Sequence, residues 1–207
     1  MERAAGIKPR LSTLLMSVLV LGGCVSVPKY PEHWAAGFPK QKPFGKADET
    51  CPSIAGSYSD AGESSPDDGS HATVSLWRTL FAGRALQDDV TIRDSEGGTL
   101  QMVAWKDGKP IAQRTLVFQK TAVSGCNKSD GCYRCLNGLT YATVPSKNSC
   151  VPAIACSNDN FLYRGQDGWL VLKRNEFKFY DFVFPWWGTW KTRWYRFRPL
   201  PSMTDAP

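Results

Sequence analysis

Cysteine is the residue type in this chain with the widest choice of chemistry. A thiolate can attack an electrophile, bind a metal ion or pair with a second thiol in a disulfide. Cys24 differs from the other cysteines because it ends an apolar run and directly follows Leu21-Gly22-Gly23. The remaining six occupy polar, loop-like surroundings further along the chain: Cys51, Cys126, Cys132, Cys135, Cys150 and Cys156.

The segment before Cys24 has the pattern of an export signal. Arg3, Lys8 and Arg10 outweigh Glu2 in the first ten residues, and residues 11–23 carry no charge. A helix that crosses a membrane needs about 20 apolar residues, so this run is too short to span one. A basic start, a short apolar stretch and small residues before a cleavage point are typical of a secretory signal peptide.

Leu21-Gly22-Gly23-Cys24 resembles the lipobox of bacterial lipoproteins. The resemblance implies that residues 1–23 are a cleaved signal peptide and that the Cys24 thiol carries a diacylglycerol. It also implies that the new amino group receives a fatty acyl chain such as palmitate, so that the protein is held firmly in a membrane. In this family an Asp after the cysteine favours the inner membrane. Val25 and Ser26 stand there instead, which implies the outer membrane, facing the periplasm.

The six other cysteines are an even number in an exported protein, which predicts up to three disulfides. Five of them lie between Cys126 and Cys156 in a Gly-, Ser- and Asn-rich segment, which we expect to be a stapled polar loop. Two alternatives stay open. Cys132 and Cys135 have the spacing of half a zinc ribbon or of a redox pair, although the second zinc pair and a helix start are missing from the pattern.

Other catalytic constellations are not evident in the sequence. His33 and His71 are the two histidines, and no Gly-x-Ser-x-Gly pattern or phosphate-binding glycine loop accompanies them. One acidic stretch lacks the ordered spacing of a calcium loop, so we expect its side chains to be solvated. Its residues are Asp60, Glu63, Asp67 and Asp68. The sequence therefore predicts no catalytic residue, no metal and no cofactor.

Residues 186–198 interleave aromatic and basic side chains. Strand alternation places Trp190 and Trp194 on one face and Arg193 on the other, and a β-bulge after Trp194 would keep Tyr195 and Phe197 with the tryptophans. A core strand with a basic outer side, or contact with a partner or lipid, would explain the pattern. Single-stranded nucleic acid is bound by the same residue types, but the envelope location argues against it. The candidate contact residues are Trp186, Trp187, Trp190, Arg193, Trp194 and Arg196.

The mature chain divides into a tether, one domain and a tail. Residues 24–50 contain four prolines and predict a semi-extended tether, whose aromatic residues could pack on the domain or rest on lipid. Residues 51–200 are predicted to form one disulfide-stapled β domain, and residues 201–207 a disordered tail. The opening Cys51-Pro52-Ser53-Ile54-Ala55-Gly56-Ser57-Tyr58 resembles that of small proteobacterial lipoproteins, in which a cysteine precedes a Gly-x-Tyr strand.

The apolar periodicity predicts the fold class. Residues 74–86 fit a short helix, capped by Ser70 or Thr73 and ended by Gly83. Asp107-Gly108 and residues 165–168 each predict a hairpin turn. The strands are expected at 90–93, 99–106, 111–120, 161–164, 169–173, 177–184 and 189–198. The sequence thus predicts a mainly β domain, an antiparallel sheet rolled or partly closed as a barrel, with one short helix.

The charge distribution and the predicted envelope location both bear on the function. The net charge is +6, with eight acidic and three basic side chains in residues 51–105 and seven basic and two acidic in residues 170–198. Such asymmetry could bring two parts of the fold together, present a basic face to an anionic envelope component or an envelope protein, or reflect solvated faces of opposite sign. We expect a lipid-anchored envelope protein with a non-enzymatic binding or structural role. The alternative is a periplasmic thiol–disulfide or hydrolytic enzyme.

Overall fold

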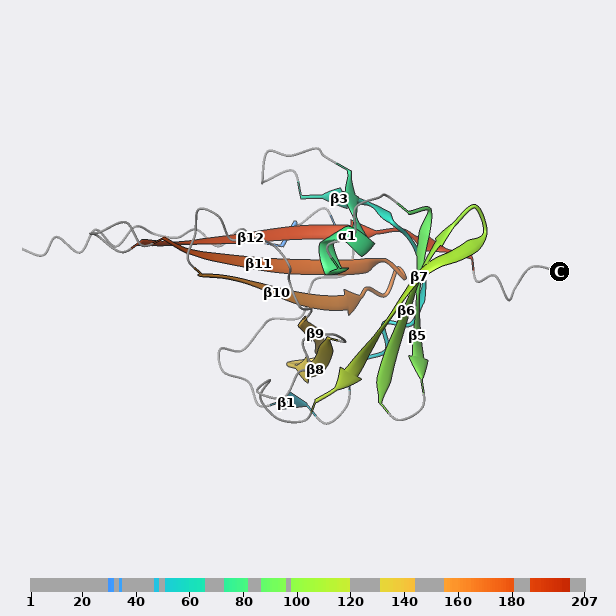
Figure 1. Ribbon diagram of the computed structural model, residues 1–207, viewed down its shortest axis with the longest axis horizontal. Helices are drawn as coiled ribbons and strands as arrows, with labels where there is room; N and C mark the ends of the chain where they lie inside the picture. Colours follow the sequence, from blue (N-terminus) through green and yellow to red (C-terminus); the bar gives the residue numbers. More distant parts are fainter. Residues whose placement is uncertain are drawn as a thin grey trace, which may run out of the picture.

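The computed structural model describes residues 30–31, 34, 47–48, 51–65, 73–81, 87–95, 98–119, 131–143, 155–180 and 187–201. Within these residues the fold is mainly β, with one short helix (Figure 1). The elements are β1 (Ala47–Asp48), β2 (Gly56–Ser59), β3 (Ala61–Ser64), β4 (Val74–Ser75), α1 (Leu76–Phe81), β5 (Asp89–Ser95), β6 (Thr99–Lys106), β7 (Lys109–Phe118), β8 (Cys132–Leu136), β9 (Leu139–Thr143), β10 (Ala155–Arg164), β11 (Leu170–Tyr180), β12 (Trp187–Phe197) and β13 (Pro199–Leu200).

The strands hydrogen-bond into one sheet in the order β13-β2-β5-β6-β7-β8-β9-β10-β11-β12-β3-β4, with β1 beside β8. Neighbouring strands are antiparallel, except that β7 and β8 run parallel where Val117 lies opposite Cys132. The sheet is curled but not closed into a barrel. The predicted fold class, a rolled, mainly antiparallel β domain with one short helix, is therefore confirmed.

The curl brings two groups of strands across one another. In Figure 1 the green strands β5, β6 and β7 run across the long orange strands β10, β11 and β12, with β8 and β9 between the groups. The segment from β2 to β3 joins the groups, because β2 pairs with β5 and β13 while β3 pairs with β12. The side of the sheet that faces into this curl is called the inner face below, and the opposite side the outer face.

The inner face and α1 enclose the main core. Alternate residues along each strand point inward, as the two-residue period of a strand requires. Leu76, Trp77 and Leu80 of α1 pack into the same interior. The largest side chains that are almost completely buried are Tyr58, Phe197, Ile54, Leu76, Ile92, Met102, Leu116, Leu139, Leu162, Leu170, Leu172 and Val90.

Both predicted hairpins are present. Asp107 and Gly108 connect β6 to β7 with φ angles of 50° and 69°, the pair of positive values that a type I′ turn requires. Pro110 lies near the start of β7 opposite Trp105, where the register shifts between Ala104 and Trp105. Residues 165–169 connect β10 to β11, and Gly165 and Trp169 hydrogen-bond across that turn.

Two strand predictions were wrong. Residues 169–173 and 177–184 were expected to form separate strands, but β11 runs without interruption from Leu170 to Tyr180. The polar run Arg174-Asn175-Glu176 resembles a loop in sequence. In the structure these residues pair on both sides with β10 and β12, so the ladder supplies the backbone hydrogen bonds that a break would lose.

The expected polar loop between Cys126 and Cys156 also contains ordered strands. β8 and β9 form a hairpin around Asn137 and Gly138, whose φ angles are 53° and 74°. This is another type I′ turn, and Asn-Gly is its favoured sequence. The dipeptide Asn137-Gly138 was thus a signal for this hairpin that the sequence prediction missed.

The helix prediction was right in place but wrong in its start and its cap, and its predicted end at residues 82–86 lies outside the described residues. α1 spans Leu76–Phe81, and the two residues before it form β4 instead. Ser75 caps the helix, because its hydroxyl accepts a hydrogen bond from the backbone N–H of Arg78 at 3.0 Å. Thr73 precedes β4, while Ser70 and Gly83 lie outside the described residues.

Asp60 connects the start of α1 to the sheet. Its side chain is fully buried between β2 and β3, and its carboxylate accepts three hydrogen bonds. The donors are the Ser75 hydroxyl at 2.7 Å, the Trp77 N–H at 2.7 Å and the Gln87 N–H at 2.9 Å. The expectation that Asp60 is a solvated loop residue was therefore wrong. It is a buried acceptor that fixes three chain segments together.

We predict that Asp60→Asn lowers the free energy of unfolding by about 2–3 kcal/mol. The amide keeps the volume but turns an NH₂ group towards buried N–H and O–H donors, which leaves at least one donor without an acceptor. Denaturant unfolding measures the change. The control is Asp107→Asn in an exposed type I′ turn, which should change stability by less than about 0.5 kcal/mol. Equal effects of the two variants would contradict the role given to Asp60.

Candidate functional site

The aromatic and basic residues of β12 are divided between the two faces of the sheet. The expected β-bulge after Trp194 is absent, because β12 pairs with β11 in one unbroken register from Trp187 to Phe197. Strict alternation then places Tyr195 and Phe197 on the inner face, where they are 4% and 0% exposed. Their burial in the core outweighs any gain from gathering all the aromatic rings on one side.

The six candidate contact residues do not form one surface. Trp190, Trp194 and Arg196 lie on the outer face, with Trp190 60% exposed. Arg193 lies on the inner face, where it approaches the carboxylate of Glu176 at 3.9 Å. Trp186 and the side chain of Trp187 lie outside the described part of the chain.

Five outer-face residues form a row that crosses the sheet from β8 to β12. The strand registers place each directly opposite the next. Cations and rings are mixed along this row, which we call the cation–aromatic row. Its members, in order across the strands, are Arg134, Tyr141, Phe161, Lys173 and Trp194.

Neighbours in the cation–aromatic row contact each other. The Arg134 guanidinium lies 4.9 Å from the centre of the Tyr141 ring, and the Tyr141 and Phe161 rings are 5.0 Å apart. The Lys173 ammonium lies 5.8 Å from the Phe161 ring and 5.4 Å from the Trp194 ring. Burial between these rings lowers the pKa of Lys173 below its usual value. The ring quadrupoles offset part of that cost, by about 0.5–2 kcal/mol per contact.

The N-terminal segment covers one end of the row. Tyr30 and Trp34 pack edge-on against each other, and Tyr30 packs against Trp194 with ring centres 5.3 Å apart. Trp34, Val171 and Trp194 form a second buried cluster on the outer face. The sequence left open whether the tether aromatics pack on the domain or rest on lipid. Tyr30 and Trp34 pack on the domain.

Arg196 contacts the same N-terminal segment through the ring of Trp34. Its guanidinium lies 5.1 Å from the Trp34 ring and 4.5 Å from the Trp169 ring. The same group makes two hydrogen-bonded contacts to the Glu63 carboxylate, at 2.8 and 2.7 Å. Glu63 is therefore an ion-pair partner of β12, which also explains how the acidic first half of the domain meets the basic last half.

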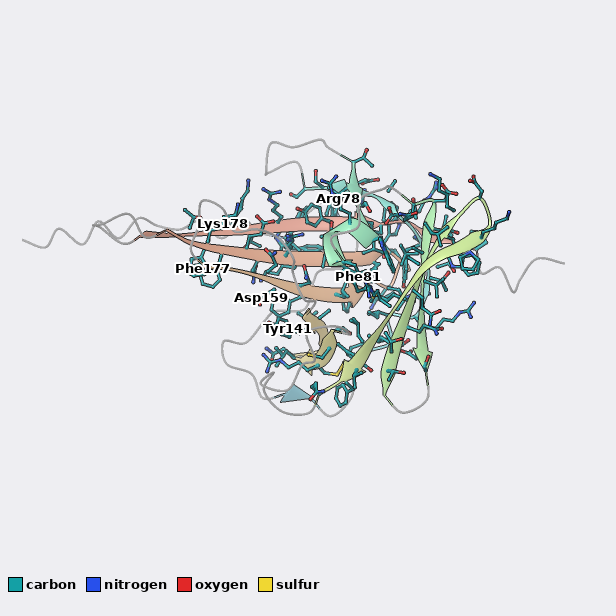
Figure 2. The ribbon with its side chains drawn as sticks, viewed as in Figure 1. Arg78, Phe81, Tyr141, Asp159, Phe177 and Lys178 are labelled. Carbon is teal, nitrogen blue, oxygen red and sulfur yellow. A yellow bond between two sulfur atoms is a disulfide. The ribbon has the colours of Figure 1, made fainter. Side chains whose placement is uncertain are left out.

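The other end of the outer face is exposed. Trp190 packs on Phe177 with ring centres 4.9 Å apart, yet keeps most of its surface in solvent. Lys178 and Lys191 are also exposed, but alternation along β11 and β12 places both on the opposite face of the sheet from this pair. Figure 2 shows Phe177 and Lys178 on the part of β11 that extends beyond α1. On the outer face this end therefore presents an uncovered aromatic surface, a feature common at membrane and protein interfaces.

The cysteines have a structural arrangement in the described region. Cys135 forms a disulfide with Cys51, 84 residues earlier in the chain, and Cys132 is disulfide-bonded as well. Cys132 and Cys135 are three residues apart on one strand, so their side chains point to opposite faces. Both are buried, at 2% and 0% exposure. Cys24, Cys126, Cys150 and the side chain of Cys156 lie outside the described part.

The remaining candidates for chemistry lie apart from these features. Asp67, Asp68, His33 and His71 are outside the described residues. Within the described ranges, no three His, Cys, Asp or Glu side chains are grouped closely enough to hold a metal ion. None of the helical segments described is long and apolar enough to cross a membrane.

The described site is thus the outer face of a rolled β sheet, with an aromatic and basic surface partly covered by the N-terminal segment. Comparison with known proteins found no match among protein-family models, curated proteins or solved structures.

Sequence reasoning missed four members of the cation–aromatic row, Arg134 among them. Tyr141, Phe161 and Lys173 are distant from residues 186–198 in sequence, and only the strand registers bring them into line with Trp194. The Asn137-Gly138 turn would have placed Tyr141 on a strand. No local signal gives the register between β9, β10 and β11, so the row itself could not be predicted.

We predict that the double substitution Cys51→Ala and Cys135→Ala lowers the free energy of unfolding by about 4–5 kcal/mol. The bond closes a long loop, and chain-entropy arguments give this size for a loop of that length. Denaturant unfolding under non-reducing conditions measures the loss. Cys24→Ser, which precedes the domain, is the control and should leave the stability unchanged. A loss below about 1 kcal/mol would contradict a stabilising role for this disulfide.

Proposed function

We propose that this chain is a lipid-anchored protein of a bacterial outer membrane, facing the periplasm, with a non-enzymatic binding or structural role. We further propose that its outer face is held against the membrane surface. The lipobox-like sequence at Cys24 supports the anchor. The packing of Tyr30 and Trp34 on Trp194 is the observation that supports the orientation.

The orientation follows from chain length. Tyr30 is six positions after Cys24, and an extended chain covers at most about 3.3–3.6 Å per residue. The Cα atom of a lipidated Cys24 would therefore lie within about 22 Å of the Cα atom of Tyr30. Without the Tyr30 contact, the whole 24–50 segment would act as a flexible spacer, and any face of the domain could turn towards the membrane.

The exposed end of the outer face has the chemistry of an interfacial surface. Trp190 and Phe177 offer an aromatic pair, and tryptophan favours the headgroup region of a bilayer. On the same face, Arg134 and Lys173 of the cation–aromatic row are partly exposed, and a basic residue near an anionic surface contributes about 1 kcal/mol. Anionic phospholipid headgroups are therefore the envelope component that this surface suits best.

The alternative function, a thiol–disulfide enzyme, fits the geometry less well. Such an enzyme needs two cysteines that reach each other, one of them accessible as a thiolate. Cys132 and Cys135 instead point to opposite faces of β8, and Cys135 is joined to Cys51. The observed arrangement favours a structural use of these sulfurs.

We predict that Cys24→Ser abolishes incorporation of a radioactive or clickable fatty acid in growing cells. The serine hydroxyl is a poor replacement for the thiol that accepts the lipid, so the uncleaved precursor should accumulate. Gel mobility and fatty-acid labelling measure both effects. The matched control is Ser26→Ala, which should be labelled and cleaved normally. Normal labelling of the Cys24→Ser protein would contradict the anchor.

We predict that Trp190→Ala weakens binding to phosphatidylglycerol-containing vesicles about fivefold or more, the usual cost of losing an exposed aromatic contact. The assay is co-sedimentation of the chain from position 24 onward, carrying Cys24→Ser so that no lipid confers binding. The control is Ile111→Ala on β7, which removes another exposed apolar residue, 50% exposed, from a different part of the sheet. Equal losses in the two variants would contradict membrane contact by the outer face.

A further inference from the structure

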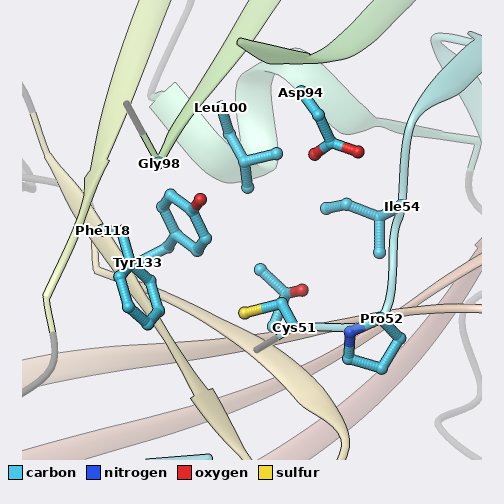
Figure 3. A pocket seen from close by; sticks show the side chains of 9 residues that line it. Cys51, Pro52, Ile54, Asp94, Gly98, Leu100, Phe118 and Tyr133 are labelled. Carbon is cyan, nitrogen blue, oxygen red and sulfur yellow. The ribbon is translucent and has the colours of Figure 1, made fainter. Parts of the chain in front are cut away.

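A cavity of about 220 Å³, open to solvent on one side, lies in the curl of the sheet, on the opposite side from the cation–aromatic row. Pro52, Asp94 and Gly98 are exposed at its mouth. Its walls come from the segment before β2 and from strands β5 to β9. Figure 3 shows the side chains of Ile54, Leu100, Phe118 and Tyr133 around this space, with the carboxylate of Asp94 at one side. Nothing in the function proposed above depends on this cavity.

The body of the cavity is apolar. Ile54 and Leu100 are 1% and 2% exposed, and they face the ring pair formed by Phe118 and Tyr133, whose centres are 5.4 Å apart. The sulfur of Cys51 lines the same space, and its disulfide to Cys135 fixes the segment before β2 against β8. A rigid apolar cavity of about 150 Å³ is already large enough to bind benzene, so this one can hold a single ring with a short substituent.

One polar group in the cavity lacks a partner. Thr140 lines the space and is only 1% exposed, yet its hydroxyl has no hydrogen-bond partner among the residues that the structure describes. Buried polar groups are almost always satisfied, because leaving one without a partner costs about 1–3 kcal/mol. The Thr140 hydroxyl can both donate and accept, so it is available to a polar atom of a bound molecule.

The charge in the cavity is negative. Among the described residues that line it, Asp94 alone is charged; it is exposed at the rim, and its carboxylate accepts a hydrogen bond from the Ser53 hydroxyl at 2.6 Å. No ion pair to Asp94 occurs among the described residues. Burial, and to a smaller extent the nearby Asp94, raises the pKa of Tyr133, so its phenol stays neutral and can donate a hydrogen bond. An anionic ligand would meet repulsion here, whereas a cation would gain a partner.

We propose that this cavity binds a small amphipathic amine. The apolar part of the ligand would lie between Ile54, Leu100 and Phe118. Its ammonium group would pair with the carboxylate of Asp94, and a second polar atom of the ligand would bond to the Thr140 hydroxyl. The site therefore selects for a ring-sized apolar body that carries a positive charge.

Three probes of matched size and different charge test this proposal: benzylamine, benzyl alcohol and benzoate. Calorimetric titration uses the chain from position 24 onward with Cys24→Ser. We expect saturable binding of benzylamine. Benzyl alcohol should bind about tenfold more weakly because it lacks the positive charge that pairs with Asp94, and benzoate should not bind because its carboxylate is repelled by Asp94. Absence of saturable benzylamine binding, or equal binding of benzoate, would overturn the proposal.

Substitutions then locate the binding. Asp94→Asn should reduce benzylamine affinity about tenfold and leave benzyl alcohol unchanged, because it removes only the charge. The control, Asp107→Asn, removes a carboxylate from the exposed β6–β7 turn and should change neither. Thr140→Val should weaken binding of both compounds. Unchanged benzylamine affinity in Asp94→Asn would refute the assigned pairing.

A filling variant provides the last check. Leu100→Phe occupies the cavity and should abolish binding of both benzylamine and benzyl alcohol. Its fold is verified by thermal unfolding. Should that variant fail to fold, the binding site is located instead from the amide chemical-shift changes that benzylamine causes in the unsubstituted protein. Changes centred on Asp94, Leu100 and Thr140 support the cavity, and changes confined to the outer face around Trp190 refute it.

Discussion

The buried carboxylate of Asp60 is the interaction on which the arrangement of this domain depends most. It lies at the bend between β2 and β3, where the chain passes from one group of strands to the other. Its three hydrogen bonds reach β4, the first turn of α1 and Gln87, two residues before β5. An ionised group without partners would be expensive to bury, but three donors satisfy this one, so the bend and the helix start are specified together.

Strict alternation along β12 is the second constraint, and it gives the sheet two different faces. Because the register with β11 is unbroken, side chains along β12 alternate strictly between the core and the outer face. Each residue that points into the core is therefore followed by one that points outward. Tyr195 and Phe197 complete the interior under α1. Trp194 is consequently presented outward, and Tyr30 and Trp34 bury it. The N-terminal segment is thus part of the packing of the domain rather than a separate spacer at this point.

Local signals in the sequence predicted the fold where the chain itself determines the conformation. Asp107-Gly108 required a type I′ turn, and alternating apolar residues on either side required two paired strands. The prediction failed where contacts with residues distant in sequence determine the conformation. Ser75 starts the helix because Asp60 binds it from the bend between β2 and β3. Arg174-Asn175-Glu176 stays extended because β10 and β12 flank it. The cation–aromatic row also depends on distant residues, because the strand registers that align its members are set by the whole sheet.

The hairpin of β8 and β9 connects the two surfaces discussed here. Adjacent residues serve opposite faces: Tyr133 and Thr140 line the cavity, while Arg134 and Tyr141 start the cation–aromatic row. The Cys51–Cys135 disulfide lies on the inner side of this hairpin and holds the segment before β2 against it. Only the thickness of one sheet separates the surfaces, yet their side chains do not touch. Substitutions that alter charge on one side should therefore add independently to those on the other, whereas loss of the disulfide should disturb both.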